Sequence, residues 1–185
     1  MRFFIALEIP EKNRKQLNKV QQELRSIIPN ARITDNEKLH LTLAFLGQQP
    51  DDLKDQLVEI IKKAAFKISP FEVTPAYIDG FPNIHHPHTL WVGVKGDVDK
   101  LILLGENLED SLQKLHLPVD TRRFIPHIAI AKVSGLTIKD QLEIDLREVM
   151  TTHFEPIKIT QIKLFESIAD KGFHKHNTLA EIELI

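Results

Sequence analysis

The 185-residue sequence contains no cysteine and only seven glycines. Without cysteine there is no disulfide framework, no zinc site built on thiolates, no iron–sulfur cluster and no cysteine nucleophile. No glycine-rich turn follows the first predicted strand, which argues against a nucleotide site of the kind that cradles phosphates in such a turn. The chain does contain nine histidines, and these become the first candidates for chemistry.

Long apolar runs and an excess of positive charge are also absent. No run approaches the roughly 20 apolar residues of a membrane-spanning helix, and Glu8 and Pro10 interrupt the apolar start too early for a signal-peptide core. Lys and Arg total 24 against 26 Asp and Glu, whereas proteins that coat long nucleic acids are normally basic. We therefore expect a cytoplasmic protein with no membrane partner and no extended nucleic-acid tract, so that any RNA contact is local.

Hydrophobic periodicity predicts a mixed order of strands and helices. Strands are expected at 2–9, 39–46, 71–79, 89–95, 124–133, 156–165 and 177–184, and helices at 11–28, 50–66, 97–116 and 137–149. This order lacks the strict βα alternation of a parallel doubly wound fold. We expect an α+β fold with mostly antiparallel sheets and helices on the outside, forming one domain over residues 1–185.

Two of the predicted strands repeat one pattern. His40-Leu41-Thr42-Leu43-Ala44 and His127-Ile128-Ala129-Ile130-Ala131 both read His, large apolar, small, large apolar, Ala, and lie 87 residues apart (127 − 40), close to half the chain. Such a repeat indicates a duplicated unit. It predicts a bilobal arrangement with pseudo-twofold symmetry, in which the two strands line a central cleft.

Strand alternation places His40 and Thr42 on one face of the first strand, and His127 and Ala129 on one face of the second. Two opposed imidazoles suit general acid–base catalysis near neutral pH, because the ordinary pKa of His is about 6.5. An in-line displacement at phosphorus needs a base on the attacking oxygen and an acid on the leaving oxygen. A hydroxyl two residues after a histidine can donate to a phosphoryl oxygen.

These blocks resemble the two-histidine (2H) phosphoesterase superfamily, and within it the bacterial and archaeal RNA 2′,3′-cyclic phosphodiesterases, historically called 2′-5′ RNA ligases. The resemblance extends over most of the chain. It rests on the segments 2–6 (RFFIA), 39–47 (LHLTLAFLG), 81–82 (FP), 90–94 (LWVGV), 124–128 (FIPHI) and 164–167 (LFES).

The resemblance implies hydrolysis of a 2′,3′-cyclic phosphate at an RNA 3′ end to a 2′-phosphomonoester, with no metal or cofactor. His40 would be the proton donor to the leaving 3′-oxygen, His127 the base that activates water, and Thr42 a ligand of a phosphoryl oxygen. Ala129 departs from the family pattern, which has Thr or Ser at this position. We expect a weakened enzyme, unless a backbone N–H or a water replaces the missing hydroxyl.

Other functions stay open on the sequence alone. Ala129 would suit a non-catalytic RNA- or nucleotide-binding module, although pure binding does not require both histidines. A phosphodiesterase for another small cyclic nucleotide, or a 2′-5′ ligase acting in the reverse direction, would use the same motifs. We expect a monomer whose partner is an RNA 3′ end or a small cyclic-phosphate nucleotide.

Further candidates for substrate binding lie outside the motifs. Arg122 and Arg123 make the approach to the second motif basic, and Phe4 could stack on a base. His176, in the segment KGFHKHN, is a weaker candidate for a contact near the cleft. The segment IHHPH carries His85, His86 and His88, but adjacent histidines in a proline-broken loop seldom converge on one ion, so no metal site is expected there.

Overall fold

The computed structural model of the chain describes residues 1–117 and 124–185, so Arg122 and Arg123 lie outside the described part. Its helices are α1 (Glu11–Ile27), α2 (Lys54–Ala65), α3 (Val98–Lys114) and α4 (Gln141–Val149), with short 3-10 turns at Asn36–Lys38 and Asp51–Leu53. Its strands are β1 (Arg2–Glu8), β2 (Arg32–Ile33), β3 (His40–Gln48), β4 (Phe71–Phe81), β5 (Thr89–Gly96), β6 (Ile128–Lys132), β7 (Ile157–Ile159), β8 (Gln161–Asp170) and β9 (Phe173–Glu183).

One antiparallel sheet runs through the whole described structure, in the order β7-β4-β5-β6-β3-β1-β8-β9, with β2 paired to β6. The order is symmetric about its centre, where the motif strands β3 and β6 lie side by side. We call β3, β1, β8 and β9 the His40 half, and β6, β5, β4 and β7 the His127 half. This arrangement confirms the expected α+β, pseudo-twofold fold, although the two lobes share a single sheet.

The two halves also carry a matching irregularity. A bulge in β3 leaves Leu43 without a partner in β1, and a bulge in β6 leaves Ile130 without a partner in β5. The two bulged residues have the same separation in the chain as the two motif histidines. The carbonyl oxygen of Ile130 instead accepts hydrogen bonds from the side chain of Gln21 at 3.0 Å and the backbone N–H of Thr34 at 2.9 Å.

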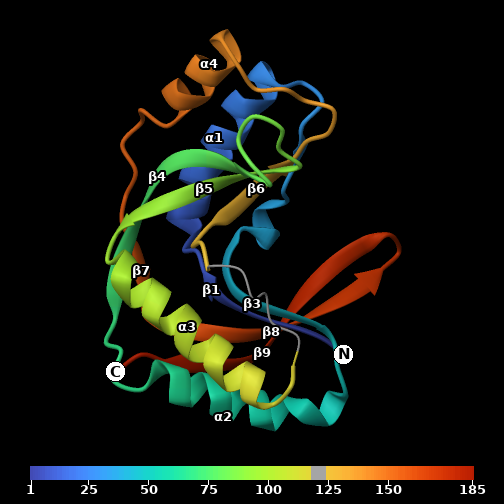
Figure 1. Cartoon of the computed structure of the whole chain (residues 1–185), viewed down its shortest axis with the longest axis vertical. Helices are drawn as coiled ribbons and strands as arrows, with labels where there is room; N and C mark the ends of the chain where they lie inside the picture. Colours follow the sequence, from blue (N-terminus) through green and yellow to red (C-terminus); the bar gives the residue numbers. More distant parts are fainter. Residues whose placement is uncertain (118–123) are drawn as a thin grey trace.

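The helices are exchanged between the halves. α1 follows β1 in the chain, yet it packs against α4 and β6, whereas α3 follows β5 and packs against α2 and β3 (Figure 1). In Figure 1, α2 and α3 lie together at the bottom of the view, and α1 and α4 lie at the top. Each half is therefore covered partly by a helix that follows a strand of the other half.

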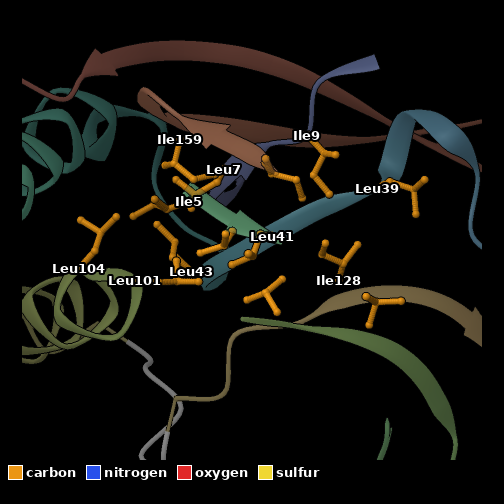
Figure 2. Packing of buried hydrophobic residues seen from close by; sticks show 14 of the residues in the cluster. Ile5, Leu7, Ile9, Leu39, Leu41, Leu43, Leu101, Leu104, Ile128 and Ile159 are labelled. Carbon is orange, nitrogen blue, oxygen red and sulfur yellow. The ribbon is translucent and has the colours of Figure 1, made fainter. Parts of the chain in front are cut away.

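The core lies on the face of the central strands opposite the histidines. Leu41 is 2% exposed and Ile128 is fully buried, and Figure 2 shows the two side chains where β3 meets β6. Leu101 and Leu104 of α3 pack close to Leu43 of β3. Burial of Leu41 and Leu43 at the start of β3 leaves His40 and Thr42 on the other face, as the alternation predicts.

Three features differ from the sequence-based expectation. The strand expected at 124–133 begins only at Ile128, because Pro126 has no N–H to donate to a neighbouring strand. The strand expected at 156–165 is two strands, since β7 pairs with β4 at one edge of the sheet and β8 pairs with β1 in the other half. The short strand β2 was not predicted.

Candidate active site

The two motifs meet where β3 and β6 pair. Leu41 lies opposite Ile128 in an antiparallel register. Continuing this register by one residue in each direction places His40 opposite Ala129 and Thr42 opposite His127. The two histidines therefore occupy diagonal positions, which are about 7–8 Å apart in a regular sheet. That spacing leaves room for a phosphoryl group between two imidazole rings.

The imidazole of His127 is oriented by the backbone two residues before it. The Nδ1–H of His127 donates to the carbonyl oxygen of Ile125 at 2.7 Å, which leaves Nε2 free for proton transfer. For His40, the backbone of Lys38, also two residues earlier, favours the protonated ring and so opposes the lowering of its pKa.

His40 belongs to a cluster of four rings, which we call the His40 cluster: His40, Phe4, Phe165 and His176. Phe4 of β1 and Phe165 of β8 stack with ring centroids 4.9 Å apart. The centroid of His40 lies 4.9 Å from that of Phe165 and 6.1 Å from that of Phe4. His176 of β9 lies 4.7 Å from Phe4 and 5.5 Å from His40. Two imidazoles therefore rest on one stacked pair of phenylalanines.

His127 is also surrounded by aromatic rings. Its centroid lies 4.9 Å from that of Phe81 and 5.7 Å from that of Trp91, with both contacts edge-to-face. Tyr77 extends this group by packing on Trp91 at 5.9 Å. The ring of Tyr77 lies over Gly93, where a Cβ atom would come within 2.2 Å of it, so a larger residue at position 93 would require the Tyr77 ring to move.

Burial drives all three imidazoles of the site toward the neutral form. Desolvation, with a smaller contribution from repulsion by His176, lowers the pKa of His40 to about 4. Desolvation also lowers the pKa of His127, against the effect of its hydrogen bond to Ile125. The pKa of His176 is lowered by desolvation and then by the nearby charges of Lys38 and His174. Without an anion between them, the rings hold little positive charge at neutral pH.

Charged side chains border the His40 cluster. Glu8 lies opposite His40 in the β1–β3 register, and its charge favours protonated His40. The carboxylate of Glu8 is held by Lys163, which also contacts Glu181 at 3.3 Å. Lys163 is 7% exposed, so this ion pair is a fixed part of the site's edge.

Comparison with known proteins shows a similarity to one family. The family model described as LigT like Phosphoesterase matches residues 7–91, which contain the first motif. An RNA 2′,3′-cyclic phosphodiesterase from Methanocaldococcus jannaschii is 24% identical over 167 residues, covering 90% of this chain and 91% of that protein. A protein of the same name from Archaeoglobus fulgidus is 26% identical over 169 residues, covering 91% and 92% of the two chains.

In sequence, the chain is similar to the LigT-like phosphoesterases.

Solved structures show the same fold. The crystal structure of TT0787 from Thermus thermophilus superposes with a TM-score of 0.76 at 22% identity and covers 100% of this chain and 98% of that one. Escherichia coli LigT in complex with 3′-AMP superposes with a TM-score of 0.76 at 21% identity, covering 99% and 97%. The similarity of fold therefore extends over the segment that carries the second motif, which lies beyond the residues matched by the family model.

The structure brings only some of the sequence-predicted site residues together. His40, Thr42 and Ala129 lie on the central strands, His127 directly precedes β6, and His176 of β9 lies beside His40. Phe4 is a correction: it is 4% exposed and stacked on Phe165, so it supports His40 and offers no open face for a base. Arg122 and Arg123 lie outside the described residues, and their predicted contacts stay predictions.

Sequence reasoning missed the roles of Phe165, Trp91 and Phe81. Each lies within 6 Å of a motif histidine, measured between ring centroids. All three residues stood in the sequence blocks that carried the family resemblance, but their contacts depend on strand order. Once β1 is known to pair with β3 and β8, alternation places Phe4 and Phe165 together on the histidine face.

No metal site or membrane span is found in the described part of the LigT-like fold. No group of three or more His, Asp or Glu side chains gathers in residues 1–117 and 124–185, and the exposed His85 and His86 belong to no such group. No helix within these residues is long and apolar enough to cross a membrane. A cavity of about 390 Å³ lies between β4 and α4, with Glu143 and Arg147 on its wall, and includes neither motif histidine.

Proposed function

We propose that this protein hydrolyses the 2′,3′-cyclic phosphate at an RNA 3′ end to a 2′-phosphomonoester. In this reaction His127 removes a proton from water, and the water oxygen forms a bond to phosphorus. The bond between phosphorus and the 3′-oxygen breaks, and His40 supplies the proton that makes this oxygen a hydroxyl. Thr42 donates to a phosphoryl oxygen, where negative charge must be stabilised.

The observation that carries the proposal is the diagonal pair of histidines, in which the Nδ1–H of His127 donates to the carbonyl oxygen of Ile125. An acid and a base on opposite sides of one phosphorus match the needs of an in-line displacement. The apolar rings around both imidazoles exclude water, which strengthens hydrogen bonds to a bound anion. The names of the relatives support the same activity and substrate for this chain.

The low pKa of His40 has a consequence for this mechanism. With a pKa of about 4, the ring is neutral at pH 7 in the free protein and cannot serve as an acid. A cyclic phosphate carries one negative charge, and an anion next to an imidazole favours its protonated form. We infer that His40 becomes protonated when the substrate enters, so that substrate binding takes up a proton.

The substrate in this proposal is an RNA 3′ end, bound mainly through its terminal nucleotide. The nearly balanced charge of the chain argues against a long phosphate track. Structures of E. coli LigT include complexes with 3′-AMP and ATP, which makes a mononucleotide cyclic phosphate a sensible second substrate here. A single bilobal domain over residues 1–185, a monomeric state and a cytoplasmic location stay predictions from the sequence.

One assay tests the proposal. Purified protein is incubated in excess EDTA with an oligoribonucleotide ending in a 2′,3′-cyclic phosphate, and the position of the product phosphate is determined. We expect a 2′-phosphate, and losses of at least about two decades in turnover for His40→Ala and for His127→Ala. His153→Ala, an exposed histidine remote from the motifs, is the matched control and should retain the wild-type rate.

The alternatives give different results in this assay. A binding module that lost its chemistry because of Ala129 would bind the cyclic end without converting it. A 3′-phosphate product would show that the other ester bond is cleaved and would overturn the roles assigned to the two histidines. Loss of turnover in EDTA, with recovery on addition of zinc or manganese, would contradict metal-independent hydrolysis.

A further inference from the structure

The missing hydroxyl and the third imidazole lie beside the same catalytic residue. The register places Thr42 opposite His127 and Ala129 opposite His40, so His127 has a motif hydroxyl beside it and His40 has none. It is His40, and not His127, that has an additional histidine 5.5 Å away. The structure thus offers a donor on the side where the second motif lacks one.

We propose that His176 donates a hydrogen bond to a phosphoryl oxygen in place of the hydroxyl absent at Ala129. The proposal rests on the proposed function, since it assumes that the phosphoryl group lies between His40 and His127. His176 is then a catalytic residue of this chain, and its hydrogen bond compensates for the hydroxyl that is missing at Ala129.

The curvature of the sheet brings His176 to this position. In the strand order, β9 is three positions away from β3, which would be about 14 Å in a flat sheet. The observed ring separation of 5.5 Å requires the His40 half to curl so that β9 faces β3. Phe4 and Phe165 fill the space between these strands and contact both imidazoles, which fixes His176 relative to His40.

In the ring of His176, Nε2 is the nitrogen that can donate to a ligand. The other ring nitrogen, Nδ1, is buried and has no hydrogen-bond partner among the described residues. A buried N–H without an acceptor is costly, so the proton of the neutral ring belongs on Nε2. The side chain is half-buried, which leaves part of the ring accessible. An imidazole keeps at least one N–H in each protonation state and can therefore donate to an anion even when neutral.

Trp91 is the competing donor. It lies opposite Ala129 on the other side, and its Nε1–H also lacks a partner within the described structure. Trp91 shares the face of Ala129 but is 3% exposed and packs against His127, whereas His176 lies beside His40, the histidine that has no motif hydroxyl opposite it. The test below separates these two residues.

The test is a double-mutant cycle between His176 and Ala129. His176→Phe keeps an aromatic ring on Phe4 but removes the donor, whereas His176→Gln keeps a donor and changes the packing. On the cyclic-phosphate oligonucleotide, we expect His176→Phe to lower kcat at least tenfold and His176→Gln to retain more activity than His176→Phe. Ala129→Ser should change the wild-type rate less than about twofold but raise the rate of His176→Phe at least fivefold.

Asn177→Ala is the matched control, because Asn177 is exposed and follows His176 on the opposite face of β9. It should leave kcat within about twofold, and each variant is first checked for folding by circular dichroism and thermal melting. If His176→Phe does not fold, His176→Ala is used in the same cycle. Equal effects of Ala129→Ser in both backgrounds, or a wild-type rate for His176→Phe, would overturn the proposal.

Two results would point elsewhere. If Trp91→Phe lost the rate and Ala129→Ser restored it, Trp91 would be the replacement donor and the assignment of His176 would be wrong. If the wild-type protein gave no turnover, the proposed function would fail, and the cycle would be repeated on binding of inorganic phosphate by calorimetry. Weaker phosphate binding by His176→Phe, restored by Ala129→Ser, would then support the proposed contact, and an unchanged affinity would overturn it.

Discussion

Phe4 and Phe165 stack with an angle of 13° between their ring planes, and each contacts both His40 and His176. The pair comes from neighbouring strands of the His40 half and separates from the main core as a small cluster with Ala6. Because both imidazoles pack on this pair, a substitution that removes one of its rings should change both the stability of the His40 half and the positions of the two imidazoles.

Removing one ring of this pair should affect both stability and catalysis. Phe165→Ala deletes a side chain that is 4% exposed, so we expect the free energy of unfolding to fall by about 3–5 kcal/mol. We also expect kcat/KM to fall at least tenfold, because His40 and His176 lose their support. Urea unfolding and steady-state kinetics, below the melting temperature, provide the two measurements.

Phe154→Ala is the control for Phe165→Ala, since Phe154 is similarly buried at 7% exposure but contacts neither imidazole in a ring pair among the described residues. It should destabilise the protein by a comparable amount and leave kcat/KM close to wild type. Equal losses of kcat/KM in the two variants would show that general destabilisation, and not the position of the imidazoles, explains the effect.

The low pKa of His40 predicts how stability depends on pH. The pKa is about 4 in the folded protein and 6.5 in the unfolded chain. Between these values the unfolded chain binds a proton that the folded protein does not, so the free energy of unfolding falls as pH drops from 6.5 to 4. The contribution of this one residue amounts to at most about 3 kcal/mol.

His40→Gln removes this titration. Urea unfolding at pH 7.5, 5.5 and 4.5 should show a smaller loss of stability for the variant than for the wild-type protein. Carboxylates and the other histidines contribute to both curves and cancel in the comparison. Parallel pH dependences for the two proteins would mean that His40 is not held neutral by burial.

Thr42 should be sensitive to loss of its hydroxyl. As the only motif hydroxyl between the two histidines, it is expected to bind a phosphoryl oxygen, and a hydrogen bond to a charged group is worth roughly 1.5–3 kcal/mol. Thr42→Ala should therefore lower kcat/KM by about one to two decades. Thr42→Ser keeps the hydroxyl and should stay within about threefold of wild type. An equal loss in both variants would assign the effect to the methyl group.

Much of the fold and half of the site can be predicted from the sequence. The repeated His-x-x-x-Ala pattern identifies His40 and His127 because local alternation alone decides which face they share. The helices follow from apolar stripes such as Leu101, Leu104 and Leu108, all fully buried. These inferences need only the periodicity of each element.

The remaining features depend on long-range pairing. The proximity of His176 to His40 requires both the strand order β3-β1-β8-β9 and the curvature of the sheet, neither of which has a local signal. The division of 156–165 into β7 and β8 likewise depends on partners in opposite halves of the sheet. The buried role of Phe4 follows from its stacking on Phe165, more than a hundred residues later in the chain.

The symmetric strand order has a genetic consequence. In a homodimer whose two identical chains met at the positions of β3 and β6, one codon would encode the same residue on both sides of the site. A mutation that removed a motif hydroxyl would then remove it from both sides. Here the two motifs lie in a single polypeptide, so position 42 and position 129 are encoded separately. A substitution can therefore alter one side alone, which lets Thr42 persist opposite His127 while alanine occupies the position opposite His40.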